Sequence, residues 1–244
     1  MNTLTKITIY LALLLVILFT TTSCFVEGFT GIRGNRNVVS EDRAIHEDFN
    51  AIKVQQGINL YLTQGNSTEI TVEADENIID LLLTEVRNNE LKVYFKKNIY
   101  KAKARNVYLT THQISSIRTS SGAHVKSENT LQVNSLVLDS SSGSSIKIYV
   151  NADEIESSTS SGADIDIFGK TKFISAKASS GSSIDADELK SVDAYAKASS
   201  GANIDINVSG KLTAKASSGG DIDYEGNPSN VDKNTSSGGS VSGS

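Results

Sequence analysis

The sequence predicts an all-β protein, a single-stranded parallel β-helix or solenoid with coils of about 19–20 residues. The tripeptide Ser-Ser-Gly recurs seven times between Ser120 and Gly238, at intervals of 18 to 21 residues, which is the signature of a solenoid. Three residues after each glycine stands valine or isoleucine, and polar and apolar positions alternate around it, as in strands with one buried face. The repeat is too short for a pair of helices, and it lacks the pattern of leucine-rich repeats.

The coils, aligned on this glycine, define an expected core and an expected corner. Glycine permits a positive φ at the corner, and the small serines can bond neighbouring backbone or one another along the stack. A flexible or glycan-bearing serine tract is the alternative, but it does not explain the regular apolar residue after each glycine. The expected inward columns lie three residues after the glycine (Val125, Ile146, Ile165, Ile184, Ile204, Ile222, Val241) and seven before it (Leu136, Ile155, Ile174, Ala194, Leu212, Val231).

Residues 1–23 are interpreted as a secretory signal peptide that precedes the only cysteine. Lys6 supplies the positively charged n-region of the signal peptide. The apolar segment Ile7–Phe19 would rise only about 20 Å as a helix, less than the roughly 30 Å of a bilayer core. Small residues lead directly into Cys24, as in a bacterial lipobox, although Thr21 stands where leucine is usual. We therefore expect Cys24 to be lipidated and to anchor the protein in a membrane; the alternative is a secreted protein with a free thiol.

The mature chain divides into three predicted parts. Residues 24–48 are polar and lack clear periodicity, so they are expected to form the lipidated N-terminus and a tether. Residues 49–244 form the β-helix, with irregular coils over 49–119 and the Ser-Ser-Gly coils over 120–244. Within the irregular coils, residues 76–86 fit either a short amphipathic helix or another strand.

Composition narrows the function classes. The 244 residues are 38% hydrophobic, enough to fill a core, and a single cysteine excludes an internal disulfide framework and a cysteine-built zinc site. The three histidines are scattered without metal-ligand spacing, so no histidine-based metal site is expected. The net charge of −5 gives no general attraction to nucleic acid or anionic lipid, so no nucleic-acid partner is expected.

The tripeptide Gly57-Ile58-Asn59, followed by the Ser-Ser-Gly repeats, resembles the head-GIN-domain family of auto-transporter adhesins over about residues 45–230. The resemblance implies a right-handed β-helix that is secreted or lipid-anchored in the envelope of Bacteroidetes-type bacteria. It supplies no catalytic residues to carry over. We expect Gly57, Ile58 and Asn59 to form a corner of the first coil rather than a ligand site.

One outward column contains the main chemical pattern of the repeats, four residues after the glycine: Asp166, Asp185, Asp205 and Asp223. Stacked coils would place these carboxylates about 5 Å apart, with a repulsion of about 1 kcal/mol per pair in a water-like dielectric. This repulsion between the carboxylates would be offset by a lysine column (Lys177, Lys197, Lys215), by a cation such as calcium, or by a cationic ligand. The alternative is a solvated face that keeps the rod soluble.

These patterns favour a binding or adhesive surface over an enzyme. Regular aspartates lack the asymmetry of an acid and a base tuned to different pKa values, and no histidine follows His124 to activate a serine. We therefore expect no catalytic residues, no required cofactor, and a polysaccharide or another envelope or host surface component as the partner. The expected location is the cell envelope, anchored by lipid to the outer membrane, or outside the cell without lipid. A polysaccharide lyase or hydrolase and a purely structural envelope protein are the alternatives.

Overall fold

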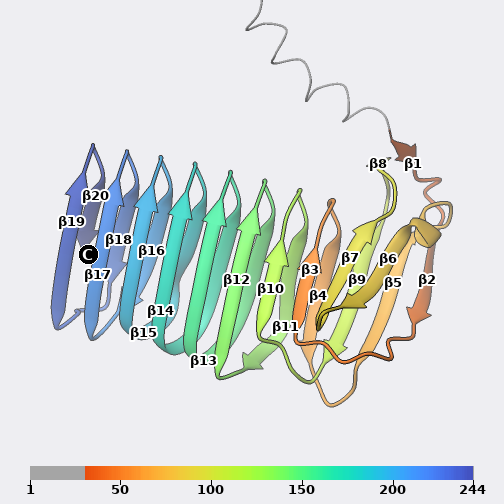
Figure 1. Cartoon of the computed structure of the whole chain (residues 1–244), viewed down its shortest axis with the longest axis horizontal. Helices are drawn as coiled ribbons and strands as arrows, with labels where there is room; N and C mark the ends of the chain where they lie inside the picture. Colours follow the sequence, from red (N-terminus) through yellow and green to blue (C-terminus); the bar gives the residue numbers. More distant parts are fainter. Residues whose placement is uncertain (1–30, 244) are drawn as a thin grey trace, which may run out of the picture.

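The computed structural model describes residues 31–243 and confirms the predicted class, because it is a β-solenoid of about seven turns with parallel stacked strands (Figure 1). The described residues contain no α-helix, only the 3₁₀ turn η1 (Ile79–Leu81). The predicted leader, residues 1–23, and Cys24 lie outside the described residues.

Each repeat coil is flattened into two sheet faces joined by a Ser-Ser-Gly turn, and these turns form one row along the upper edge of Figure 1. We call the strands before the turn the pre-turn face and those after it the post-turn face. Three long strands bend around the opposite edge and contribute to both faces: β13 (Ser145–Ser160), β14 (Asp164–Ser179) and β15 (Ser183–Ser199).

The shorter strands each belong to one face. The pre-turn face contains β3 (Ala51–Val54), β10 (Ser116–Thr119), β12 (Ser135–Ser141), β17 (Lys211–Ser217) and β19 (Asn230–Ser236). The post-turn face contains β4 (Asn59–Gln64), β11 (His124–Gln132), β16 (Asn203–Val208), β18 (Asp221–Glu225) and β20 (Ser240–Gly243).

The Ser-Ser-Gly corner is a tight turn with two consecutive residues at positive φ. In one coil Ser161 has φ 55° and Gly162 has φ 67°, and the Ala163 N–H donates to the Ser160 carbonyl at 3.3 Å, the pattern of a type I′ turn. The Gly162 N–H then donates to the carbonyl of Ser180 in the next coil at 3.2 Å. The turns therefore form a hydrogen-bonded column of their own, with a left-handed serine that the sequence did not predict.

The core contains the predicted inward columns. The column three residues after the glycine is buried from Val125 to Ile222, and the column seven before it is buried from Leu136 to Leu212. Hydroxyls complete the interior beside the turns: the Ser182 hydroxyl lies 2.9 Å from Thr159 Oγ1 and donates to the Ser179 carbonyl at 2.8 Å. Buried serine is thus tolerated because it finds partners in its own turn and in the preceding coil.

Antiparallel strands cover the N-terminal end of the solenoid. On the post-turn face β2 (Val38–Arg43) pairs with β5 (Glu69–Asp75), β5 pairs with β9 (Arg105–Thr111), and β9 continues in parallel onto β4. On the pre-turn face β6 (Leu82–Arg87) pairs with β7 (Glu90–Phe95), which lies parallel to β3, and the two-stranded sheet β1 (Ile32–Arg33) with β8 (Ile99–Lys101) completes the region.

This region differs from the expected tether. Strands β1 and β2 fall within residues 24–48, so part of that range belongs to the folded unit and not to a linker. The sequence did not predict these strands, because they lack a clear apolar alternation and their pairing partners in β8 and β5 are distant in sequence. Residues 76–86, left open between helix and strand, contain η1 followed by most of β6.

At the other end of the described chain, a lysine side chain lies across the last coil and covers the end of the core. Lys233 occupies a position where earlier coils have inward alanine, and its ammonium group donates to the Val241 carbonyl at 3.3 Å. The same group lies 4.7 Å from the centre of the Tyr224 ring. A charged group over the end of the core disfavours addition of a further strand from another chain.

Candidate ligand-binding surface

The four predicted aspartates form a continuous column on the outside of the post-turn face. Strand register places Asp166 beside Asp185, Asp185 beside Asp205, and Asp205 beside Asp223, each one coil apart. Each of these four coils therefore presents one carboxylate on the same line, because the side chain four residues after the glycine points outward. We call Asp166, Asp185, Asp205 and Asp223 the aspartate ladder.

The electrostatics of the ladder differ from those of isolated surface carboxylates. Partial burial raises the pKa of Asp185, and the neighbouring charges of Asp187 and Asp166 raise it further against one backbone hydrogen bond. Partial burial also raises the pKa of Asp205, together with the charge of Asp223 and of other nearby carboxylates. Negative charge is thus least compensated in the middle of the column, at Asp185 and Asp205.

The ladder ends in a basic and aromatic group toward the N-terminal half. Lys147 is the next residue of the column, and its ammonium group lies 3.4 Å from Asp166 and 4.8 Å from the centre of the Phe168 ring. The Phe168 ring stacks on Tyr149 with centroids 4.8 Å apart and an interplanar angle of 24°, and 42% of Tyr149 is exposed. An exposed aromatic platform thus adjoins the carboxylates.

The lysine column lies on the other face. Lys177, Lys197 and Lys215 are paired in register on the outside of the pre-turn face, with the core between them and the aspartates. Lys177 contacts Glu156 on its own face at 3.2 Å. The aspartate and lysine columns therefore lie on opposite faces of the rod, and the lysine column does not form ion pairs with the ladder.

Within residues 31–243 no group of three or more histidine, cysteine, aspartate or glutamate side chains is arranged to hold a metal ion. The ladder presents single carboxylates, one per coil, and the site contains no closed set of oxygen ligands. A cation bound there would use oxygens from neighbouring coils together with water or ligand oxygens.

Two hollows lie along the edge opposite the turns. One, of about 550 Å³, is lined by amide and other polar residues that include Gln64, His112 and Asn151. The second, of about 400 Å³, contains Asp153, whose carboxylate pairs with Lys172 at 2.8 Å. Neither lining includes the two carboxylates that glycoside hydrolysis uses.

The motif Gly57-Ile58-Asn59 lies at the first turn of the column. Gly57 has φ 68° and its N–H donates to the Ser121 carbonyl at 3.0 Å, as the repeat glycines do toward the following coil. Ile58 is fully buried, and the Asn59 amide donates to Asn106 Oδ1 at 3.0 Å. The motif thus has a structural position in the stack.

The protein-family model described as "Putative auto-transporter adhesin, head GIN domain" matches residues 48–228. The chain belongs to this family. No curated protein matches the chain. Among the residues that the structure describes, no helix is long and apolar enough to cross a membrane.

Several solved structures share the fold of this chain. A "putative adhesin" from Bacteroides fragilis has a TM-score of 0.80 at 19% identity, over 88% of this chain and all of that one. A "putative lipid binding protein" from Parabacteroides distasonis has a TM-score of 0.69 at 18% identity, over 87% of this chain and 99% of that one. A "putative adhesin" from Parabacteroides merdae also has a TM-score of 0.69, at 19% identity, over 87% and 98%. None of these descriptions names an enzyme.

The aromatic part of the head GIN surface was missed in the sequence. Tyr149 and Phe168 both stand six residues after a repeat glycine, on the outward side of consecutive coils. Only two coils have an aromatic residue there, so the position shows no regular column. The signal was the coincidence of two aromatics at equivalent positions in adjacent coils.

Proposed function

We propose that the protein is a lipid-anchored component of the cell envelope whose post-turn face binds a repetitive ligand, without catalysis. The observation that carries the proposal is the aspartate ladder beside the Tyr149–Phe168 stack on one face of the rod. The adhesin descriptions of the family and of related structures support a binding role at a cell surface. A polysaccharide or another surface polymer is the proposed ligand class.

The ladder suits a ligand that repeats. Successive coils of a parallel stack are about 4.8 Å apart, so a polymer lying along the rod would meet equivalent carboxylates at a constant interval. Each rung would contribute weakly, but several rungs engaged together gain avidity. The Tyr149 ring offers a flat apolar surface for a sugar ring next to carboxylates that accept hydroxyl hydrogen bonds. Raised pKa values at Asp185 and Asp205 also favour partners that bring hydroxyl donors or a cation.

The test of the ligand surface replaces the four ladder aspartates by asparagine and screens binding to a glycan array. Binding of the best glycan is expected to weaken by about tenfold or more, because every rung loses its charge at once. Asp139→Asn with Asp232→Asn, on the pre-turn face, is the matched control and should bind as the unmodified protein does.

Calcium tests the same surface independently. Thermal unfolding with and without calcium should show stabilisation of the unmodified protein and none of the fourfold variant. If calcium has no effect and the variant keeps full glycan binding, the ladder is only a solvated face and the protein's role is structural or lies elsewhere.

The proposed anchor is tested separately by Cys24→Ala. Loss of the acyl chains is expected to move the protein from the membrane fraction to the soluble fraction and to change its electrophoretic mobility. Unchanged fractionation and mobility would show that Cys24 is not the attachment point.

A further inference from the structure

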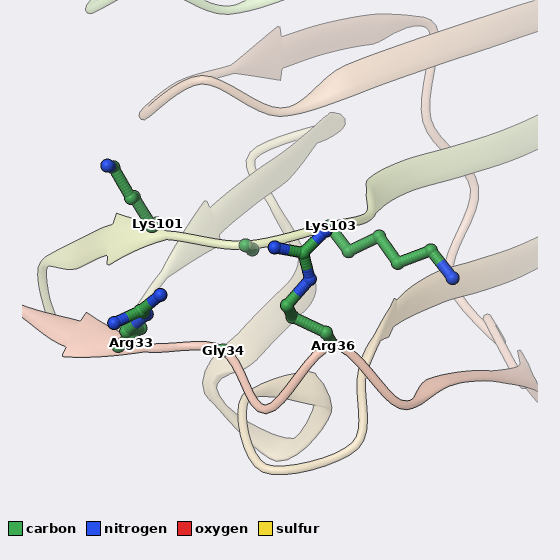
Figure 2. Close-up of a pocket in the computed structure, with 6 residues that line it drawn as sticks. Arg33, Gly34, Arg36, Lys101 and Lys103 are labelled. Atoms are coloured by element: carbon green, nitrogen blue, oxygen red, sulfur yellow. The ribbon is translucent and has the colours of Figure 1, made fainter.

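A small basic cavity lies at the N-terminal end of the solenoid, away from the aspartate ladder. Its volume is about 150 Å³, and it is formed where β1 and the loop after it meet the chain that follows β8. Figure 2 shows the guanidinium groups of Arg33 and Arg36 between these two chain segments, with the ammonium groups of Lys101 and Lys103 extending to either side. The lining residues are Arg33, Gly34, Arg36, Lys101, Ala102 and Lys103.

The two chain segments that form this cavity carry only positive side-chain charges. Residues 31–37 and 96–105 together contain seven lysines and arginines and no aspartate or glutamate, although the whole chain has a net charge of −5. Strand register sets Arg33 directly beside Lys101, so two like charges are neighbours. Among the described residues, none of the four cations that line the cavity has a carboxylate partner within ion-pair distance. An external anion bound among these cations would relieve their repulsion.

A buried carboxylate beneath the cavity holds its two walls in place. Asp75 is fully buried and accepts the N–H of Arg36 at 2.9 Å, of Lys103 at 2.9 Å and of Ala104 at 3.0 Å. Both of its oxygens are therefore used on backbone donors from the two segments. Arg36, at φ 68°, is held in a left-handed conformation by this contact, which fixes where its side chain starts. The cavity is thus formed by the fold, with its cationic groups placed in advance.

The position of the cavity indicates which anion it meets. Gly31, the first described residue, follows Cys24 by seven residues, a length of chain that spans at most about 25 Å. If Cys24 carries the lipid anchor, as proposed above, the cavity lies within that reach of the membrane surface. Phosphate is the anionic group of lipid headgroups, and arginine binds phosphate oxygens in a bidentate manner. We infer that this cavity binds the phosphate of an anionic lipid headgroup and sets the covered end of the rod against the membrane.

The test removes the anchor, so that vesicle binding reports the cavity alone. Residues 31–243 contain a strand partner for every described strand and a continuous core, so a chain of residues 25–244 retains the fold. This chain is titrated with vesicles of phosphatidylcholine alone and with vesicles that also contain phosphatidylglycerol. Binding is expected only to the second kind, and Arg33→Gln with Arg36→Gln is expected to weaken it by about 25-fold, or about fivefold for each cation near the surface.

The matched control is Lys177→Gln with Lys197→Gln, which removes the same charge from the pre-turn face in the middle of the rod and should leave vesicle binding within about twofold. Lys101→Gln with Lys103→Gln provides a second cavity variant if the arginine pair unfolds, as judged by thermal unfolding.

Three outcomes overturn the inference. One is failure of the chain to bind phosphatidylglycerol vesicles, and another is an equal loss in the control pair. The third is cavity-dependent binding of inorganic phosphate without vesicle binding, which would identify a soluble phosphate compound instead. Because Cys24 is absent from this chain, none of these outcomes depends on whether the anchor exists.

Discussion

The N-terminal region and the repeat coils are both built from β-strands, but they differ in core residues and in strand pairing. In β7, near the N-terminal end, the inward residues are Leu91, Val93 and Phe95, whereas those in the pre-turn part of β15 are alanines (Ala194, Ala196 and Ala198). The N-terminal region uses antiparallel pairs, a 3₁₀ turn and a buried carboxylate, and the repeats use parallel pairs and one turn type throughout.

The difference shows what a solenoid repeat cannot do. A repeat coil satisfies its backbone groups only through the coils on both sides, so the first coil needs strands of another kind to cover it. The antiparallel strands β2, β5 and β6 do this, and their connections bring in polar groups that must be paired within the fold. Asp75 and the aspartate ladder therefore represent opposite cases: a carboxylate that the fold needs and carboxylates that the fold tolerates.

Asp75→Asn is expected to have the largest effect. The asparagine amide keeps one acceptor oxygen, but its NH₂ group would face backbone N–H groups that then lack an acceptor. The free energy of unfolding should therefore fall by about 3 kcal/mol at neutral pH. Although burial raises the pKa of Asp75, three backbone N–H groups and Lys103 outweigh it and lower that pKa overall. Its stabilisation is therefore present above about pH 4 and lost as the pH falls through the lowered value, so the difference between the two proteins should shrink in acid. Urea unfolding at several pH values measures this difference in the free energy of unfolding. Asp139→Asn, at an exposed position, is the control. If both substitutions lower the free energy of unfolding equally, Asp75 is no more important to the fold than a surface carboxylate.

Gly181→Val tests the repeat turn. Gly181 has φ 66°, and an added Cβ would meet no atom within 4 Å, so only the backbone conformation opposes a side chain. A β-branched residue in the left-handed region should lower the free energy of unfolding by about 2 kcal/mol. Gly181→Asn, which tolerates this region, should cost less than half as much. If valine and asparagine are equally well tolerated in thermal unfolding, conformational strain does not explain the regular recurrence of the turn glycines along the chain.

Asp205→Asn is expected to have the smallest effect, with the opposite sign to Asp75→Asn. Burial and neighbouring carboxylates raise the pKa of Asp205, so its ionised form costs stability in the folded state. The substitution should stabilise the protein by a few tenths of a kcal/mol at neutral pH, a size reduced by solvent screening. The raised pKa means that the native carboxyl is fully favourable only below about pH 4, and the gain from asparagine should vanish there. Destabilisation at neutral pH would indicate that the ladder carries a bound cation.

The sequence alone was sufficient for the repeat coils and the position of the ladder. A side-chain period of two and a repeat of about 19 residues leave one register, because a slip of one residue would turn Ile165 and Ile184 outward and Asp166 and Asp185 into the core. The resemblance carried by Gly57-Ile58-Asn59 added the family, and the structure placed that motif in the first turn of the column.

Only the tertiary structure decided the N-terminal region, the separation of the two charged columns and the basic cavity. Strands β1 and β2 are short, and they are identified by partners in β8 and β5 that lie 27 to 68 positions away. Arg33 and Lys101 are likewise distant in sequence, so no local pattern places them side by side. The net charge of the chain does not reveal this local cluster of cations, because it does not show which charged residues are neighbours in space. Periodic contacts between neighbouring coils are recorded in the sequence as a repeat, whereas a contact that occurs once is defined only by the folded chain.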